Sequence, residues 1–204
     1  MNRRKALKNL GATIGITTLP PTILSIFESC QKNNSNKLLS FNNEQFEFIS
    51  SIIDIIIPRT DTPGAIDLNL NKFIDVYIEE VLYKKEKENF LKGLDICKKN
   101  IQIVDEKSLK GLLDKYLKID DNLTDKYDDM ISDFEDDLKN GRNSVLNENI
   151  LEYTFIKKLR DFTVMSFRIN EFIAKNEMEY LPVPGKYDGC IDLNEATGGK
   201  VWAL

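Results

Sequence analysis

Apolar residues recur every three or four positions along residues 41–174, and this spacing constrains the fold more than any other feature of the chain. Such a period places the apolar side chains on one face of an α-helix. The first stripe ends at Pro58, because proline has no backbone N–H and clashes with the preceding helical turn. We therefore predict an all-α fold, with a single compact helical domain over residues 41–179. Further stripes predict helices over residues 70–82, 90–101, 109–117, 127–138 and 151–174.

Two segments cannot be regular helix. Residues 58–65 contain two prolines, a glycine and an aspartate, a composition that specifies a fixed irregular loop. Residues 180–204 begin with two further prolines and a glycine, so we predict an irregular, extended C-terminal arm. Trp202, near the end of this arm, is either a lid on the core of its own domain or an anchor in a partner.

The composition is typical of a soluble globular protein, with 42% hydrophobic and 30% charged residues in a chain of 204. The net charge is −5, and the first thirty residues contribute +3 of it, which leaves about −8 on residues 31–204. Phosphate groups bind basic patches, so this acidic body argues against a nucleic-acid partner. It also argues against adsorption of the folded domain to an anionic membrane.

The sequence contains no histidine, which removes the commonest general base and metal ligand. Its three cysteines are far apart and form no C-x-x-C pair, which argues against zinc, iron–sulfur and covalent haem sites. No glycine-rich phosphate-binding motif is present. We therefore expect no catalytic residue, metal site or cofactor in this chain. Cys97 and Cys190 either form a disulfide or stay unpaired, and the helical position of Cys97 favours a buried free thiol.

The acidic segments each allow two interpretations. Residues 120–125 resemble a calcium-binding loop only faintly, because the glycine and the closing glutamate of such a loop are missing. We favour the start of a helix, with Asn122 or Thr124 as its N-cap. The carboxylates of residues 128–137 form either a catalytic pair or a solvated helix face, and their spacing favours the solvated face.

The first thirty residues have the order of an export signal. Arg3 and Arg4 precede an apolar residue and a lysine, as in a twin-arginine signal, and an apolar run follows over residues 10–27. The threonines and the proline pair in this run make it too weak and too broken for a transmembrane span. We predict a twin-arginine signal peptide over residues 1–30; the alternative is a basic N-terminal helix packed on the domain.

Cys30 ends this signal, and a polar tether rich in asparagine and lysine follows over residues 31–40. A cysteine at such a junction is typical of a lipoprotein, with acyl chains on Cys30. Phe27 and Glu28 are unusual before a lipidated cysteine, so ordinary cleavage nearby or an uncleaved anchor is the alternative. We expect the protein to lie in the periplasm, with a lipid on Cys30 as its only attachment to a membrane.

Two motifs identify a family. Residues 55–65 read IIIPRTDTPGA and are followed by Phe-Ile-Asp at residues 73–75; residues 180–190 read YLPVPGKYDGC and are followed by Trp202. With the twin-arginine leader, these motifs resemble the gluconate 2-dehydrogenase subunit 3 family over about residues 41–202. The chain departs from the family pattern just before the arm, where Phe-Arg-Ile-Asn-Glu replaces a Tyr-Phe-Thr-Ser-Glu-like stretch.

The resemblance implies a small, non-catalytic subunit that accompanies a large flavin-dependent sugar or polyol dehydrogenase of the glucose-methanol-choline oxidoreductase type. FAD is then expected in the large subunit, which passes electrons to a cytochrome c or another carrier. The leader fits this role, because twin-arginine export serves cargo that folds before it crosses the membrane. We expect the irregular segments to bind the partner through the family-like residues Pro58, Arg59, Thr60, Asp61, Pro63, Gly64, Tyr187 and Trp202.

Two other functions stay open. A free-standing extracytoplasmic binding lipoprotein would need a closed pocket, and a carboxylate-based hydrolase would need two inward-facing carboxylates in one cleft. A dehydrogenase subunit should instead expose apolar side chains and an arm that reaches off the body.

Overall fold

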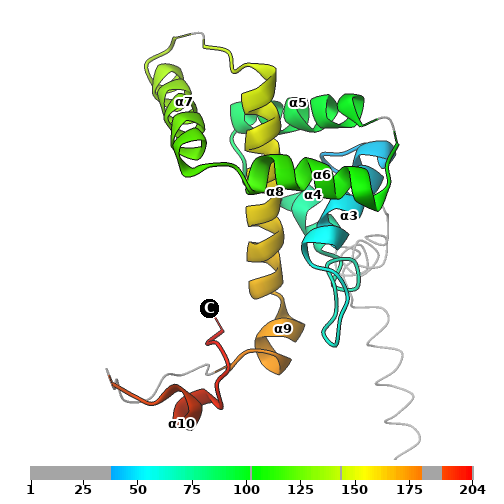
Figure 1. Cartoon of the computed structure of the whole chain (residues 1–204), viewed down its shortest axis with the longest axis vertical. Coiled ribbons are helices and arrows are strands. Elements are labelled where there is room, and N and C mark those ends of the chain that lie inside the picture. Colours follow the sequence, from blue (N-terminus) through cyan, green and yellow to red (C-terminus); the bar gives the residue numbers. More distant parts are fainter. Residues whose placement is uncertain (1–37, 102, 143, 181–189, 204) are drawn as a thin grey trace, which may run out of the picture. The chain divides into compact units, whose positions relative to one another are not determined.

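The computed structural model describes residues 38–101, 103–142, 144–180 and 190–203 (Figure 1). Within these ranges the chain forms eight α-helices and no strand, which confirms the all-α prediction. The helices are α3 (Asn43–Ile56), α4 (Leu70–Glu80), α5 (Lys84–Asn100), α6 (Glu106–Leu117), α7 (Asp121–Lys139), α8 (Glu148–Arg168), α9 (Glu171–Asn176) and α10 (Leu193–Thr197).

Four of the residues that the sequence singles out lie outside the described part of the chain: Arg3, Arg4, Cys30 and Tyr187. Among the helices that are described, none has the length and apolar character needed to cross a membrane.

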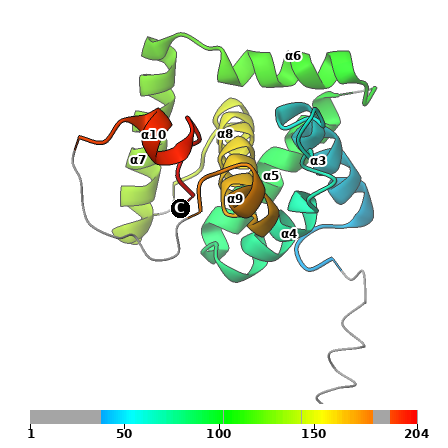
Figure 2. The ribbon, with the colours of Figure 1, turned by 90° about the horizontal axis from the view of Figure 1, so that it is seen from below.

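Helix α8 lies at the centre of the domain. It packs against α3, α4, α5, α6, α7 and α9. Figure 2 views it end-on, with α3 and α4 to one side and α7 to the other. Residues 150–156 are buried without a break, so this part of α8 faces protein on every side. A helix surrounded in this way is buried all round, whereas the helices at the surface bury only one stripe.

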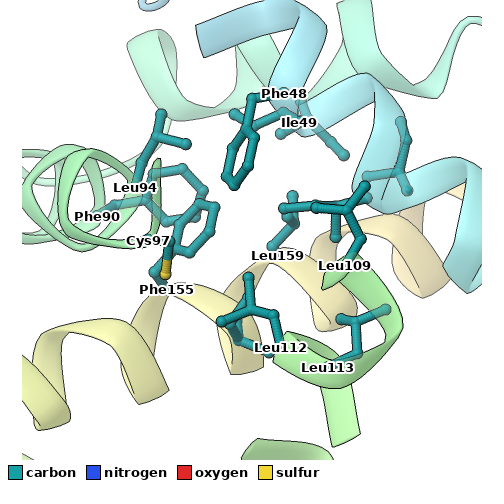
Figure 3. Packing of buried hydrophobic residues seen from close by; sticks show 14 of the residues in the cluster. Phe48, Ile49, Phe90, Leu94, Cys97, Leu109, Leu112, Leu113, Phe155 and Leu159 are labelled. Carbon is teal, nitrogen blue, oxygen red and sulfur yellow. The ribbon is translucent and has the colours of Figure 1, made fainter. Parts of the chain in front are cut away.

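Helix α5 approaches α8 so closely that one position requires glycine. A Cβ atom on Gly93 would lie 2.4 Å from the carbonyl oxygen of Leu151 and 2.7 Å from the Cβ atom of Phe155. One turn away, the rings of Phe90 and Phe155 meet edge-on with their centroids 4.9 Å apart. Figure 3 shows Phe90 and Leu94 of α5 beside Phe155. The close approach brings these large side chains into one core.

The start of α7 differs in detail from the prediction. Residues 120–125 do begin a helix, but the side chain that caps it belongs to Asp120, whose carboxylate accepts the N–H of Asn122 at 2.8 Å. The hydroxyl of Thr124 instead donates back to the carbonyl of Asp120 at 3.2 Å. Neither Asn122 nor Thr124 is the N-cap, because α7 starts at Asp121 and the residue directly before it, Asp120, already satisfies an open N–H of the first turn.

The last predicted helix, over residues 151–174, is in fact two helices. Helix α8 ends at Arg168, and the side chain of Asn170 accepts the N–H of Phe172 at 3.0 Å to start α9. The apolar pattern continues across this break, so a prediction from periodicity alone treats the two helices as one.

The arm, predicted to be extended, contains the short helix α10. Its N-terminus is capped by Asp192, which accepts the N–H groups of Asn194 and Glu195 at 2.9 and 3.1 Å. Its C-terminus is ended by Gly198, which has a φ of 62°. A side-chain cap and a left-handed glycine are sufficient to bound one turn of helix after the prolines.

We expect Gly93→Ala to lower the free energy of unfolding by about 1–3 kcal/mol, because the added methyl group would force α5 and α8 apart. Urea denaturation followed by helical circular dichroism measures this change. Lys92→Ala, at the exposed neighbouring position, is the control and should shift stability by less than about 0.5 kcal/mol. A Gly93→Ala protein as stable as the parent would contradict the close contact between the two helices.

Candidate functional site

The irregular loop that the two prolines predict is present and is closed by backbone hydrogen bonds. The N–H of Ala65 donates to the carbonyl of Ile57 at 2.9 Å, and the N–H of Thr60 donates to the carbonyl of Thr62 at 3.0 Å. The buried methyl group of Ala65 joins the hydrophobic core. The loop is thereby fixed at its base, directly after α3.

Asp67, which the sequence analysis did not single out, holds the inside of this loop. One carboxylate oxygen accepts the N–H of Gly64 at 3.0 Å, and the other lies 3.3 Å from the guanidinium of Arg59. A Cβ atom on Gly64 would lie 2.6 Å from the backbone nitrogen of Arg59, so this fold of the loop requires glycine there. Arg59, Thr60 and Asp61 stay exposed, as residues that contact a partner must be.

An open groove of about 450 Å³ runs between the second half of α3 and the start of α6, and Pro58 of the loop also lines it. Its apolar lining comes from Ile55, Pro58, Val104 and Leu109, and its charged lining comes mainly from carboxylates. One of them, Asp105, caps α6, and hydrogen bonds from Ser108 hold the pKa of this carboxyl below its usual value. The charged residues of the groove are Asp54, Asp105, Glu106 and Lys110.

The C-terminal arm is anchored at the end of α9. The N–H of Glu179 donates to the carbonyl of Val201 at 2.9 Å, and the N–H of Ala203 donates to the carbonyl of Glu179 at 2.9 Å. These bonds place Trp202 opposite Glu179. Trp202 is 42% exposed and is not one of the buried residues of the hydrophobic core.

The loop and the arm are held by different residues. Contacts within residues 57–67 hold the loop, whereas contacts with residues 176–179 hold the arm. The structure therefore anchors the two predicted partner-binding segments separately.

A buried carboxylate holds the first described residues of the domain through hydrogen bonds. Asp75 of α4 accepts the backbone N–H groups of Leu39, Ser40 and Phe41 at 2.7, 2.9 and 3.0 Å. The hydroxyl of Ser40 also donates to Glu79, one helical turn further along α4. Asp75 belongs to the family-like motif quoted above, but its role was not visible in the sequence. It ends the polar tether by fixing the first residues of the domain.

A second buried carboxylate, Glu152, joins three helices. Its side chain is 3% exposed, and it accepts hydrogen bonds from Asn100 at the end of α5 and from the hydroxyl of Tyr116 in α6. The ammonium group of Lys115 lies 3.1 Å away and 4.6 Å from the centroid of the Tyr116 ring. Three donors thus satisfy one carboxylate in the interior.

These contacts decide the protonation of the cluster. Burial by itself raises the pKa of Glu152, but the hydrogen bonds from Tyr116, Lys115 and Asn100 outweigh burial and hold the pKa below its usual value. Burial, followed by the hydrogen bond to Glu152, raises the pKa of Tyr116. At neutral pH the carboxylate is therefore charged and the phenol is a donor.

The Glu152 cluster forms one wall of an open cleft of about 480 Å³ beside α6. The residues that line it combine apolar, polar and charged side chains with one glycine: Asn100, Ile101, Ile103, Ser108, Gly111, Leu112, Lys115 and Glu152.

Other candidate residues have structural roles. Cys97 is a buried free thiol, as the sequence favoured, and burial raises its pKa. Most carboxylates of α7 face solvent, but Asp128 accepts from Lys157 at 2.7 Å and from the hydroxyl of Tyr153 at 3.0 Å, and so docks α7 on α8. Within the described residues no group of three His, Cys, Asp or Glu could hold a metal ion.

The two buried carboxylates of the described chain, Asp75 and Glu152, belong to separate clusters. Each is occupied by its own donors, so they do not form the inward-facing pair that a hydrolase would need.

A helical domain with a fixed proline-rich loop and an anchored C-terminal arm is thus the class of protein that this chain defines. The model of the gluconate 2-dehydrogenase subunit 3 family matches residues 43–185, which include the whole loop and most of the described helices. The chain belongs to this family. Membership implies a small subunit of a dehydrogenase complex. No curated protein and no solved structure matches the chain.

We expect Glu152→Gln to lower the free energy of unfolding by about 2–3 kcal/mol at pH 7, because the new amide would face donors that a carboxylate satisfied. The folded pKa of Glu152 lies below its reference value of 4.5. The stability it contributes is therefore present above pH 4.5 and is lost as the pH falls through the folded pKa.

Denaturation curves at several pH values test this sign. The gap between the parent and Glu152→Gln should narrow below pH 4.5. Glu47→Gln, an exposed change on α3, is the control and should behave like the parent at each pH. A gap that widens in acid would show that Glu152 is protonated in the folded protein.

Proposed function

We propose that this chain is the non-catalytic small subunit that carries, exports and stabilises a periplasmic flavin-dependent sugar or polyol dehydrogenase of the glucose-methanol-choline type. The match of the family over residues 43–185 carries this proposal. FAD and the catalytic residues belong to the large subunit, which passes its electrons to a cytochrome c or a similar carrier.

The chemistry of the chain supports an accessory role. The sequence has no histidine and no nucleotide-binding glycine motif. Its buried carboxylates are engaged with backbone N–H groups in the case of Asp75 and with side chains of α5 and α6 in the case of Glu152. Such groups hold helices together, and redox chemistry falls to the partner.

The exposed apolar side chains support a protein partner. The arm exposes several large apolar side chains, and apolar surface is costly to leave in water. The loop adds a rigid edge beside the groove next to α6, which reduces the entropy lost on binding. The exposed apolar residues of the arm are Tyr180, Ile191, Leu193, Val201 and Trp202.

The leader completes the proposal. A twin-arginine signal at Arg3 and Arg4 would export this chain after folding, with the large subunit bound and already loaded with flavin. A lipid on Cys30 would then hold the complex at a membrane, since each buried methylene adds about 0.8 kcal/mol.

We expect sugar oxidation in the periplasm only when this chain is expressed together with the flavoprotein encoded beside it. Dye-linked oxidation in periplasmic and cytoplasmic fractions measures it. When Arg3 and Arg4 are both replaced by lysine, the activity should stay in the cytoplasm. A large subunit that reaches the periplasm and oxidises sugar normally without this chain would contradict the proposal and favour a free-standing binding lipoprotein.

We expect Trp202→Ala to weaken the complex by at least about 2 kcal/mol, because an exposed tryptophan that anchors an interface contributes on this scale. Its effect on the unfolding of the chain alone should be below about 0.5 kcal/mol, since the indole lies outside the core. Val145→Ala, which removes an apolar side chain that is 88% exposed, is the matched control. Equal losses of folding and of complex would show that the arm only completes the domain.

A further inference from the structure

Asn140 and Gly141 form the turn that ends α7, from which the chain continues to α8 (Figure 1). No other Asn-Gly pair occurs in the sequence. Gly141 has a left-handed φ of 70°, and the N–H of Arg142 donates to the carbonyl of Asp137 at 2.8 Å. A left-handed glycine followed by such a bond is a common way to end a helix. The pair thus has a structural role, but it also carries chemistry that the candidate site does not use.

The side-chain amide of Asn140 is accessible to attack. Both Asn140 and Gly141 are exposed to solvent. Glycine has no Cβ atom and a wide choice of backbone conformations, so its backbone nitrogen can approach the side chain of the residue before it. A bulkier residue in place of Gly141 would hinder this approach. Solvent exposure also supplies the water that hydrolysis of the amide consumes.

We infer that Asn140 is a site of spontaneous deamidation in the folded protein. The backbone nitrogen of Gly141 attacks Cγ of Asn140, and a bond forms between these two atoms. The bond from Cγ to Nδ2 breaks, and the amide nitrogen leaves as ammonia with the proton that the Gly141 nitrogen loses. Water then opens the cyclic imide. Addition at Cγ gives aspartate, whereas addition at the main-chain carbonyl gives isoaspartate. Water is the only co-reactant, and the inference does not depend on the function proposed above.

One hydrogen bond opposes the reaction. The side-chain amide of Asn140 donates to the carbonyl of Asp136 at 2.8 Å, and this bond has to open before Cγ can meet the nitrogen of Gly141. The bond is exposed, so water can replace the lost partner when it opens. It therefore slows the reaction without preventing it.

Asn176, at the end of α9, is a matched comparison within the same chain. It is also exposed, and its side-chain amide donates to the carbonyl of Phe172, four residues earlier, at 2.7 Å. The residue that follows it is Glu177 instead of glycine. A difference in rate between Asn140 and Asn176 therefore measures the effect of the glycine.

The product weakens the end of α7 in two ways. A new carboxylate at residue 140 lies at the C-terminus of a helix, which already carries a partial negative charge. It also lies close in sequence to Asp136 and Asp137, whose ion pairs with Lys139 and Arg142 have N–O distances of 2.9 Å. Isoaspartate adds a methylene to the main chain as well, which moves Arg142 relative to Asp137. We expect the end of α7 to loosen where isoaspartate forms.

The test follows the purified full chain during incubation in neutral buffer. Peptide mass spectrometry measures the fraction of each asparagine that has exchanged its amide for a carboxylate, and chromatography separates isoaspartate from aspartate. Asn140 should convert at least about tenfold faster than Asn176, because only Asn140 is followed by glycine. Gly141→Ala should slow the conversion of Asn140, and Glu177→Gly should speed the conversion of Asn176.

Two variants at residue 140 complete the design. Asn140→Gln should keep its amide through the same incubation, because its longer side chain has to close a larger and less favourable ring. Asn140→Asp has the new charge with a normal backbone. The isoaspartate form of the parent should unfold at a lower temperature than Asn140→Asp, since isoaspartate also lengthens the main chain.

Each outcome decides the inference. Faster conversion of Asn140 than of Asn176, lost in Gly141→Ala, supports it. Equal rates at the two asparagines overturn it, because the glycine then has no effect. Conversion of Asn140 in the urea-unfolded chain but not in the folded chain also overturns it, because the bond to Asp136 then protects the site. None of these outcomes bears on the proposed function, which complex formation tests separately.

Discussion

The burial of residues 150–156 of α8 on every side is the constraint on which the rest of the structure depends. Residues 150–156 have no solvent face, so each polar group among them must find its partner within the protein. The hydroxyl of Thr154 bonds back to the carbonyl of Ile150 at 2.7 Å. The carboxylate of Glu152 has no such local partner, and it draws donors from α5 and α6. One buried charge thereby sets how two other helices sit on the central one.

Asp75 of α4 acts in a similar way on the first described residues of the domain. It lies in the middle of α4, beyond the first turn, where the N–H groups of a helix are open. Three consecutive N–H groups of residues 39–41 satisfy its carboxylate instead. Both carboxylates join segments that are 34 or more residues apart. Each carboxylate holds separate segments of the domain together, which explains how an acidic chain can bury two acids.

The sequence was a good guide to those features that depend on neighbours along the chain. Five of the six stripes fall within single helices, and the two prolines and Gly64 mark a loop that is indeed closed and fixed. The break at Asn170 and the helix that Asp192 caps were missed, because one polar side chain decides each and the apolar pattern does not register it.

The buried acids were missed for a different reason. Glu152 lies in the stretch of α8 that is buried all round, so no polar face distinguishes it from its neighbours. Asp75 bonds residues that periodicity cannot bring together. In a chain with 33 acidic residues, two that face inward leave no local signal. Tertiary contacts alone separate them from the solvated acids of α7.

The loop and the arm differ in how strongly the domain orders them, and this difference divides their work in the proposed complex. The loop is closed by backbone bonds and by both oxygens of Asp67, so it loses little entropy when a partner binds. The described part of the arm is joined to Glu179 by two backbone bonds and exposes large apolar side chains. The conformational entropy that the arm loses on binding opposes association, whereas the burial of its apolar surface favours it. The loop is therefore suited to set the orientation of the partner, and the arm to supply the affinity.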